Sequence, residues 1–134
     1  MALNLEGGCL CGDIRYKVSG ELDPEDTPSL CHCRTCQQAS GAPVMPWATF
    51  NEKDIIITRG EPKVYHSSET AVRKFCGRCG SQIFFHRRGS HMLEITTVSL
   101  DTPDAIDPVR HIWVQSQRKY LNITDSLPKH QQES

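Results

Sequence analysis

Apolar and polar side chains alternate along much of the chain with a period of two residues, as in a strand with one buried face. The clearest case is the segment 14–18, Ile-Arg-Tyr-Lys-Val, which follows the first pair of cysteines. Turn residues such as Gly60, Pro62 and Gly89 separate further short segments rich in apolar residues. These segments predict strands over 44–50, 55–58, 63–67, 72–75, 82–86 and 92–99, and one more over 111–114.

Helical periodicity is nearly absent, and this sets the fold class. Only residues 37–40, between Cys36 and Gly41, predict a short helical turn. The segment 21–28, rich in Glu, Asp and Pro, predicts an exposed loop. We therefore predict a mainly β fold of antiparallel sheets, with a single domain over residues 1–127. The polar residues 128–134 are expected to form a frayed C-terminal tail.

Composition and charge narrow the function classes. An apolar fraction of 37% supplies a modest core, and the net charge of −1 lacks the basic excess of a protein that neutralises phosphates. A nucleic-acid partner is therefore not favoured. No run of about 18 apolar residues predicts a membrane span, and the first residues lack the basic and apolar regions of an export signal. We expect a soluble, cytoplasmic protein with no membrane partner.

Seven cysteines in three clusters are the strongest chemical signal in the sequence. In a reducing compartment, an odd number of cysteines favours metal or catalytic roles over a disulfide framework. The clusters are Cys-Leu-Cys at 9–11, Cys-His-Cys-Arg-Thr-Cys at 31–36 and Cys-Gly-Arg-Cys-Gly at 76–80.

The last cluster has the C-x-x-C-Gly pattern of a turn that directs two thiolates at one ion. Its two glycines provide the backbone freedom for this turn, so Cys76 and Cys79 are predicted metal ligands. Cys9 and Cys11 can complete a tetrahedral site, because residues two apart in an extended segment project the same way. We expect these four thiolates to hold a structural zinc that ties the N-terminal strand to the middle of the sheet.

Cys31, Cys33 and Cys36 remain, and they are close enough in sequence to bind one ion from a single loop. Three protein ligands with an exchangeable fourth position are the arrangement of a catalytic zinc. The alternative is that a histidine closes this site and makes it structural too. The candidate histidines are His32, His66, His86 and His111.

Two further interpretations of the cysteines stay open. C-x-x-C pairs occur in thiol oxidoreductases, although neither pair here lies in the strand–helix–strand context of that chemistry. A zinc ribbon that binds protein or nucleic acid is a better competitor, and the near-neutral charge counts against its nucleic-acid version.

With these motifs, the chain resembles the glutathione-dependent formaldehyde-activating enzyme family, which also includes a domain of centromere protein V. The resemblance extends over nearly the whole chain. It rests on Gly-Gly-Cys-Leu-Cys-Gly at 7–12, Cys-His-Cys-Arg-Thr-Cys at 31–36, Phe-Cys-Gly-Arg-Cys-Gly at 75–80 and His-Ile-Trp at 111–113.

The resemblance implies a tent-like arrangement of antiparallel sheets and two zinc ions. It assigns the structural zinc to Cys9, Cys11, Cys76 and Cys79, and the catalytic zinc to Cys31, Cys33 and Cys36. The family's named activity is formation of S-hydroxymethylglutathione from glutathione and formaldehyde, a carbon–sulfur lyase reaction. A small-molecule thiol such as glutathione and a small aldehyde are therefore the expected partners.

The expected chemistry follows from the thiolate ligands. Three thiolates on a divalent zinc leave a formal charge of about −1, which disfavours generation of hydroxide. Such a zinc is better suited to binding a substrate thiolate, or to holding a small carbonyl oxygen while a thiol adds to the carbon. Such a zinc is expected to lower the pKa of the bound thiol and hold it against an aldehyde. His32 is a candidate proton relay, although a histidine between two ligands more often faces solvent or caps backbone.

Other side chains are candidates for substrate contacts. Guanidinium groups bind carboxylates such as those of glutathione, and the candidates are Arg34, Arg73, Arg78 and Arg110. Aromatic side chains can wall a pocket, and the candidates are Trp47, Phe50 and Trp113, with Trp47 first because it closely follows the 31–36 motif.

Two functions from different classes remain. The first is a zinc-dependent carbon–sulfur lyase acting on a thiol–aldehyde adduct, which the lack of an eighth cysteine favours. The second is a non-catalytic zinc-binding module that mediates protein interactions. An open fourth position on the second zinc distinguishes them, and the oligomeric state stays undetermined.

Overall fold

The computed structural model describes residues 1–133 and folds them mainly into short strands. The strands are β1 Leu3–Gly8, β2 Arg15–Gly20, β3 Ser29–Cys31, β4 Met45–Asn51, β5 Ile55–Arg59, β6 Lys63–Tyr65, β7 Ala71–Phe75, β8 Gln82–Arg87, β9 Met92–Thr96 and β10 Arg110–Ile112. The helical segments are α1 Arg34–Ser40 and the 3-10 turns η1 Glu52–Asp54, η2 Thr97–Ser99 and η3 Val114–Ser116. The prediction of a mainly β fold is confirmed.

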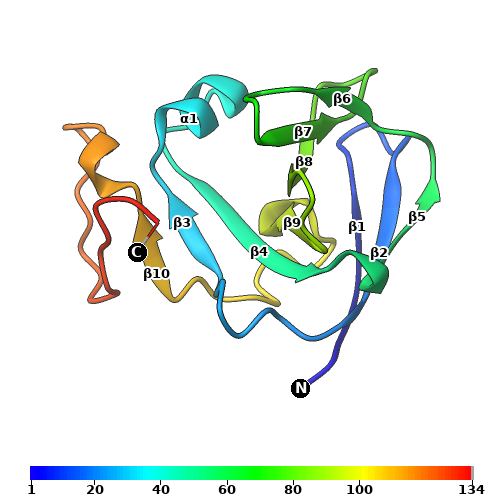
Figure 1. Cartoon of the computed structure of the whole chain (residues 1–134), viewed down its shortest axis with the longest axis horizontal. Helices are drawn as coiled ribbons and strands as arrows, with labels where there is room; N and C mark the ends of the chain where they lie inside the picture. Colours follow the sequence, from blue (N-terminus) through cyan, green and yellow to red (C-terminus); the bar gives the residue numbers. More distant parts are fainter. Residues whose placement is uncertain (134) are drawn as a thin grey trace.

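The strands form two sheets. One has the order β1-β2-β5, and the other has the order β10-β3-β4-β9-β8-β7-β6. Figure 1 shows the small sheet at the right of the molecule. Helix α1 and β10, which is an edge strand of the larger sheet, lie at the left. Neighbouring strands are antiparallel except for β10, which runs parallel to β3. The larger sheet is therefore mixed, whereas the sequence pattern predicted only antiparallel sheets.

The small sheet shows how the alternating pattern becomes structure. On β2, Tyr16 and Val18 are buried while Lys17 between them is exposed, as the period of two predicts. Gly7 of β1 lies opposite Tyr16, and a Cβ at this glycine would approach the Tyr16 hydroxyl oxygen to 2.6 Å. The tyrosine therefore needs a glycine as its cross-strand neighbour, and its hydroxyl shares a 2.6 Å hydrogen bond with Ser99.

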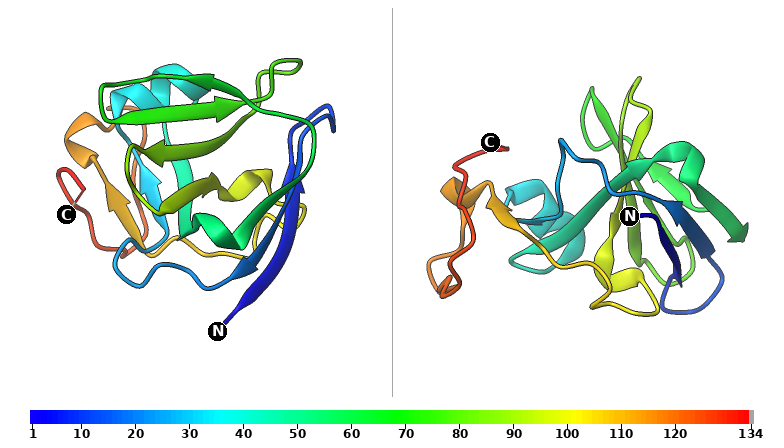
Figure 2. Two further views of the ribbon diagram at one scale, coloured as in Figure 1. Left: turned by 45° about the vertical axis from the view of Figure 1, so that its right-hand side comes forward. Right: turned by 90° about the horizontal axis from the view of Figure 1, so that it is seen from below.

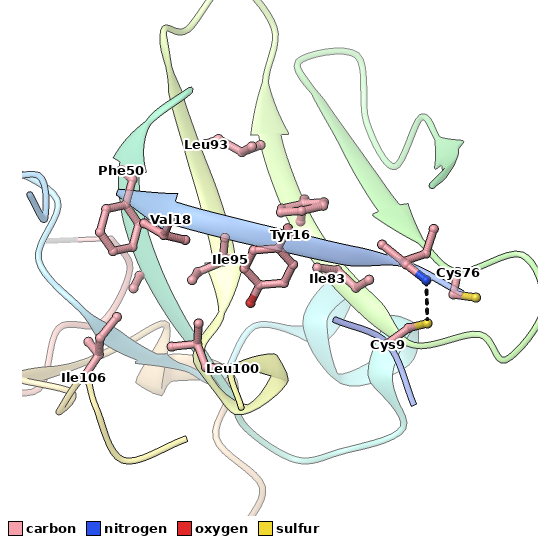
Figure 3. Close-up of a cluster of buried hydrophobic side chains, with 13 residues drawn as sticks. Cys9, Tyr16, Val18, Phe50, Cys76, Ile83, Leu93, Ile95, Leu100 and Ile106 are labelled. Atoms are coloured by element: carbon pink, nitrogen blue, oxygen red, sulfur yellow. Dashed lines mark hydrogen bonds between the residues drawn. The ribbon is translucent and has the colours of Figure 1, made fainter. Parts of the chain in front are cut away.

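The main hydrophobic core lies between the two sheets. Tyr16 and Val18 of the small sheet meet Phe50, Ile83 and Ile95 of the larger sheet, and all five side chains are almost fully buried. Figure 3 shows these side chains pointing toward one another from β2, β4, β8 and β9. Burial of this apolar surface is the main favourable term that holds the sheets together.

A second, smaller core lies elsewhere in the larger sheet. It contains Met45 and Trp47 of β4 together with two cysteines, Cys31 and Cys36. Phe85 of β8 packs against it. Each core thus contains part of one cysteine cluster, since Cys9 and Cys76 belong to the main core.

Helix α1 begins earlier than the sequence predicted. Cys33 is its N-cap, and its sulfur accepts a hydrogen bond from the Cys36 backbone N–H at 3.4 Å. The helix ends at Ser40, and its C-cap Gly41 has a left-handed φ of 75°. The predicted turn over 37–40 was therefore too short, because the cysteine motif itself forms the first helical turn. In the part of the chain described, no helix is long and apolar enough to cross a membrane.

Most predicted strands are confirmed, and the differences have local causes. The segments 3–8 and 29–31 were not predicted as strands, although they form β1 and β3. β3 has three residues, too few for a visible period, and it depends on pairing with β4 and β10. The strand predicted over 92–99 ends at Thr96, where η2 turns the chain and Tyr16 bonds to Ser99.

The C-terminal residues pack on β10, so the expectation of a frayed tail was wrong. The backbone N–H of His111 donates to the Pro128 carbonyl at 2.8 Å, and the N–H of His130 donates back to His111 at 2.9 Å. The Trp113 N–H donates to the Gln132 carbonyl at 2.9 Å. The segment runs alongside β10 in Figure 1 and Figure 2. Ser134, the last residue of the predicted tail, lies outside the described residues.

Candidate functional site

Four cysteine sulfurs from two turns meet at one end of the main core. Cys9 and Cys11 lie in the turn between β1 and β2, and Cys76 and Cys79 lie in the turn between β7 and β8. The four sulfurs lie within 4.8 Å of one another. Figure 3 shows Cys9 and Cys76 side by side at the edge of the core. The structure therefore gathers the four cysteines that the sequence grouped, and they could hold a metal ion.

Distances in this four-thiol cluster fit a tetrahedral ion. The Cys9 and Cys11 sulfurs are 3.6 Å apart, and the Cys11 and Cys76 sulfurs are 3.7 Å apart. Four sulfurs at about 2.3 Å from a central zinc would be about 3.8 Å apart in tetrahedral geometry. The Ile14 backbone N–H also donates to the Cys9 sulfur at 3.2 Å, a contact that stabilises thiolate.

Backbone turns bring these sulfurs together. The Gly80 N–H donates to the Cys76 carbonyl at 2.8 Å, and Gly80 has a left-handed φ of 78°. Gly12 has a φ of 85° and donates to the Cys9 carbonyl at 3.2 Å. Both turns need a residue without a Cβ at the position that reverses the chain. This explains why each of these two cysteine pairs is followed by glycine.

The other three cysteines form a second cluster around the start of α1. Cys31 ends β3, Cys33 caps the helix and Cys36 lies in its first turn. Their sulfurs lie within 4.8 Å of one another, and those of Cys31 and Cys36 are 3.6 Å apart. Helix and strand thus place three thiols around one point, and they could hold a second metal ion.

The thiols of this three-thiol cluster influence one another strongly. Hydrogen bonds from Cys31 and Cys36 lower the pKa of Cys33 to about 2, whereas hydrogen bonds with Cys33 and Cys36 raise the pKa of Cys31. Opposite shifts within one cluster mean that ionising one thiol disfavours ionising the next, because like charges repel at short range. A divalent cation between the sulfurs would remove this repulsion and stabilise all three thiolates.

The three-thiol cluster opens onto a cavity of about 430 Å³, a size typical of small-molecule sites. Trp47 and Trp113 line this cavity, as the sequence analysis expected. Phe50 does not: it is fully buried in the main core, because its position on β4 faces the small sheet. Phe85, which was not a candidate, lines the cavity instead, with its ring 6.0 Å from that of Trp47.

Arg73 of β7 links the three-thiol cluster to the cavity wall. Its guanidinium is 3.6 Å from the Cys36 sulfur, donates to the Thr35 hydroxyl at 3.1 Å and lies 5.0 Å from the centre of the Phe85 ring. The Arg73 side chain is only 6% exposed. A buried cation beside thiolates offsets their negative charge, so this arginine favours an ionised cluster.

The histidine of the 31–36 motif does not face solvent. His32 is buried, and its Nε2 lies 2.9 Å from Nδ1 of His111, whose Nε2 lies 2.9 Å from the Asp125 carboxylate. Burial, and then the nearby His111, lower the pKa of His32. The chain of contacts runs from the cysteine loop through β10 to the molecular surface.

The alternative that a histidine closes the three-thiol cluster finds no support in these contacts. His32 and His111 bond to each other, His66 bonds to Arg88, and His86 bonds to the Ser90 carbonyl. Among residues 1–133, no histidine nitrogen joins the three sulfurs within 4.8 Å.

Comparison with known protein families identifies the family of this chain. Residues 4–116, which include all seven cysteines, match the family described as glutathione-dependent formaldehyde-activating enzyme. The chain belongs to this family. The resemblance noted from the sequence motifs is thereby confirmed.

Individual relatives agree with this membership in the formaldehyde-activating family. An uncharacterized lyase of Schizosaccharomyces pombe is 35% identical over 80 residues, which are 60% of this chain and 56% of that protein. The match therefore spans just over half of that relative. A Halomonas elongata protein, provisionally named a glutathione-dependent formaldehyde-activating enzyme, is 23% identical over 129 residues, 89% of this chain and 80% of its own.

A solved structure has a similar fold. The crystal structure of a Rhodobacter sphaeroides protein superimposes with a TM-score of 0.59 at 26% sequence identity, and the match covers 78% of this chain and 92% of that one. The likeness to this structure supports the fold, and the names of the matched family and of the two sequence relatives are those of enzymes.

The four arginines proposed from sequence divide into two groups. Arg34 and Arg73 line the cavity, although Arg34 also bonds to Gln37 at 2.8 Å. Arg78 instead pairs with Asp13 near the four-thiol cluster, and Arg110 pairs with Asp26. Neither lines the cavity, so neither is placed to bind a substrate there.

Three charged residues of the cavity, Arg87, Glu94 and Glu133, were not among the candidates from the sequence of this family member. Arg87 of β8 lines the cavity and forms an ion pair with Glu133. Glu94 of β9 lines it too, between the buried Leu93 and Ile95. The alternation on β9 indicated that Glu94 faces away from the main core, but no sequence signal indicated that a cavity covers that other face.

Proposed function

We propose that this chain is a zinc-dependent carbon–sulfur lyase that forms S-hydroxymethylglutathione from glutathione and formaldehyde, and cleaves it in the reverse direction. The observation that carries the proposal is the three-thiol cluster at the wall of an aromatic cavity. A cluster with three protein donors leaves one position for a substrate, and the cavity gives that substrate a place to bind.

Zinc is the ion that best fits the donors of both clusters. All seven donors are thiols, and soft thiolates select zinc over harder cations that prefer oxygen. Cys9, Cys11, Cys76 and Cys79 would hold a structural ion, since four thiolates complete its coordination. Cys31, Cys33 and Cys36 would hold the second ion, which supplies stabilisation of a substrate thiolate when bound.

In this proposal, the residues around the three-thiol cluster supply charge compensation and apolar walls. Arg73 offsets the negative charge of the three cysteine thiolates through its contact with Cys36. Trp47, Phe85 and Trp113 form apolar walls that limit water around the reacting atoms. Confining a thiol and an aldehyde in one cavity accelerates their addition, because the encounter no longer costs free translation and rotation.

Recognition of glutathione requires cations for its two carboxylates. Arg87 is the best placed, because it lines the cavity and its partner Glu133 is exposed, so a substrate carboxylate could take the place of that partner. Arg34, exposed at the cavity rim, is the second candidate. Arg73 is engaged by Thr35 and the cysteine cluster, so its role is electrostatic support.

The competing function, a non-catalytic zinc module for protein interactions, differs in one measurable property. Its second zinc would not exchange a ligand with small thiols. The test is the visible absorption spectrum of the fully cobalt-loaded protein during titration with glutathione, with Cys31→Ser as the control. A saturable spectral change that the variant lacks supports the proposal. An unchanged spectrum of the loaded wild-type protein would reject glutathione as substrate.

Replacing Arg73 with methionine is expected to weaken zinc binding at the three-thiol cluster. Methionine keeps an apolar stem against Phe85 but removes the charge beside Cys36. Loss of such a supporting contact typically lowers metal affinity by about 10–100-fold. Competition with a chromogenic chelator measures this change. The control is Arg59→Met, which removes an exposed arginine of β5, and equal zinc release by both variants would contradict the role of Arg73.

A further inference from the structure

The Glu94 side chain occupies an unusual place for a carboxyl group. On β9, Leu93 and Ile95 face the main core, so Glu94 between them projects from the opposite face of the sheet. Its cross-strand neighbours are Thr49 on β4 and Phe85 on β8. Phe85 and the three cysteines of the second cluster line the same cavity as Glu94, so this carboxyl shares the cavity with the thiols.

The surroundings of Glu94 favour its protonated form. Burial, and then the negative charge of Asp26, raise the pKa of Glu94 to about 8, and Glu133 acts in the same direction. The cations Arg87 and Arg73 oppose this shift without cancelling it. Arg87 is paired with Glu133, and Arg73 is bonded to Thr35 and the cysteine cluster.

The neighbours of Glu94 leave its carboxyl free to act on a ligand. The Asp26 carboxylate is engaged by its own partners, the Arg110 guanidinium at 2.7 Å and the Thr49 hydroxyl at 2.9 Å. Among the side-chain hydrogen bonds of residues 1–133, none involves the Glu94 carboxyl. A partly enclosed acid that faces a cavity, without a hydrogen-bond partner of its own, is suited to exchange protons with a bound molecule.

We propose that Glu94 is the catalytic acid and base of the thiol–aldehyde reaction, a role that rests on the proposed function. In the forward direction, the sulfur electron pair forms the C–S bond, and the C=O π electrons move to oxygen. Glu94 gives its proton to that oxygen, which produces the hydroxymethyl group. The proton released by the substrate thiol restores the Glu94 acid, so the sum is one thiol plus one aldehyde giving one hydroxymethyl thioether.

The reverse reaction uses the same groups. Glu94 first gives up its acid proton, and the resulting carboxylate removes the hydroxyl proton of the adduct. The C=O bond then forms again, the C–S electron pair leaves on sulfur, and the proton given up by Glu94 completes the thiol. The neutral form of Glu94 also matters for the electrostatics of the cavity. A neutral acid donates a hydrogen bond to the aldehyde oxygen without repelling a thiolate. The ordinary, ionised form of a glutamate would repel it.

The decisive experiment compares wild-type protein with Glu94→Gln, which is neutral and nearly the same shape but carries no transferable proton. Exchange between ¹³C-formaldehyde and S-hydroxymethylglutathione is followed by NMR across pH 6 to 9, a range of about one to two units around the pKa of the carboxyl. We expect kcat to fall about 100-fold or more in the variant, with KM for glutathione unchanged. The wild-type rate should also fall as pH rises through about 8, where Glu94 loses its proton, and this limb should be missing in the variant.

The control is Glu6→Gln, the same substitution at an exposed position of the small sheet. Wild-type kcat in Glu94→Gln, or an unaltered pH profile, would overturn the role of Glu94 alone. Wild-type protein that does not accelerate exchange would overturn the proposed function and this role with it. If the variant does not fold, the wild-type pH profile decides, because a rate without a limb near pH 8 excludes an acid of this kind.

Discussion

Replacing Cys79 with serine is expected to destabilise the whole fold. Cys79 belongs to the four-thiol cluster that joins the β1–β2 turn to the β7–β8 turn, and this cluster packs on the main core. In small zinc domains the metal contributes directly to folding, with apparent binding free energies of about 10–16 kcal/mol. We expect the variant to lose at least about 3 kcal/mol, a drop of roughly 10 °C in melting temperature for a domain of this size.

Thermal unfolding followed by circular dichroism, before and after zinc chelation, measures this loss. The matched control is Cys33→Ser, since Cys33 and Cys79 are both half-buried cysteines of the two clusters. Serine is also a good N-cap, so the start of α1 should persist in that control. A Cys79→Ser protein that melts at the temperature of Cys33→Ser would show that the four-thiol cluster does not stabilise the fold more than the three-thiol cluster does.

The same Cys33→Ser variant is expected to stay folded and lose its lyase activity. Serine keeps the helix cap, but it removes one of the three sulfurs that surround the proposed catalytic ion. Without the ion that would bind the reacting thiol, only proximity within the cavity would accelerate the reaction. The rate should therefore fall by about a factor of 1,000 or more. Formation of S-hydroxymethylglutathione measured by NMR gives this rate, and zinc content shows the loss of one ion per chain.

A control on the same helix separates catalysis from helix stability. Gln38→Ala lies on the exposed side of α1, outside the cavity, and should retain wild-type activity. If Cys33→Ser kept most of its activity while holding a single zinc, the reaction would not depend on the three-thiol cluster. The four-thiol cluster or a different part of the cavity would then need to be tested.

Much of the fold was predictable because a strand with one buried face shows a local alternation of apolar and polar residues. The alternation over residues 14–18 and the turn residues between later segments correctly predicted most strands of both sheets. Predictions failed where local pattern was not the deciding factor. β3 exists only through its neighbours β4 and β10, and the C-terminal residues are ordered by backbone hydrogen bonds to β10.

The sequence by itself determined the fold class and the division of the seven cysteines into four and three. Cysteine spacing is a local property, and the turns that follow from Gly12 and Gly80 are local too. Only the tertiary structure decided which other residues face the three thiols. Arg73, Phe85 and Glu94 come from three neighbouring strands, and they meet because strand register places them on one face of the larger sheet. A period of two tells which residues share a face within one strand, but register between strands depends on the packing of the whole domain.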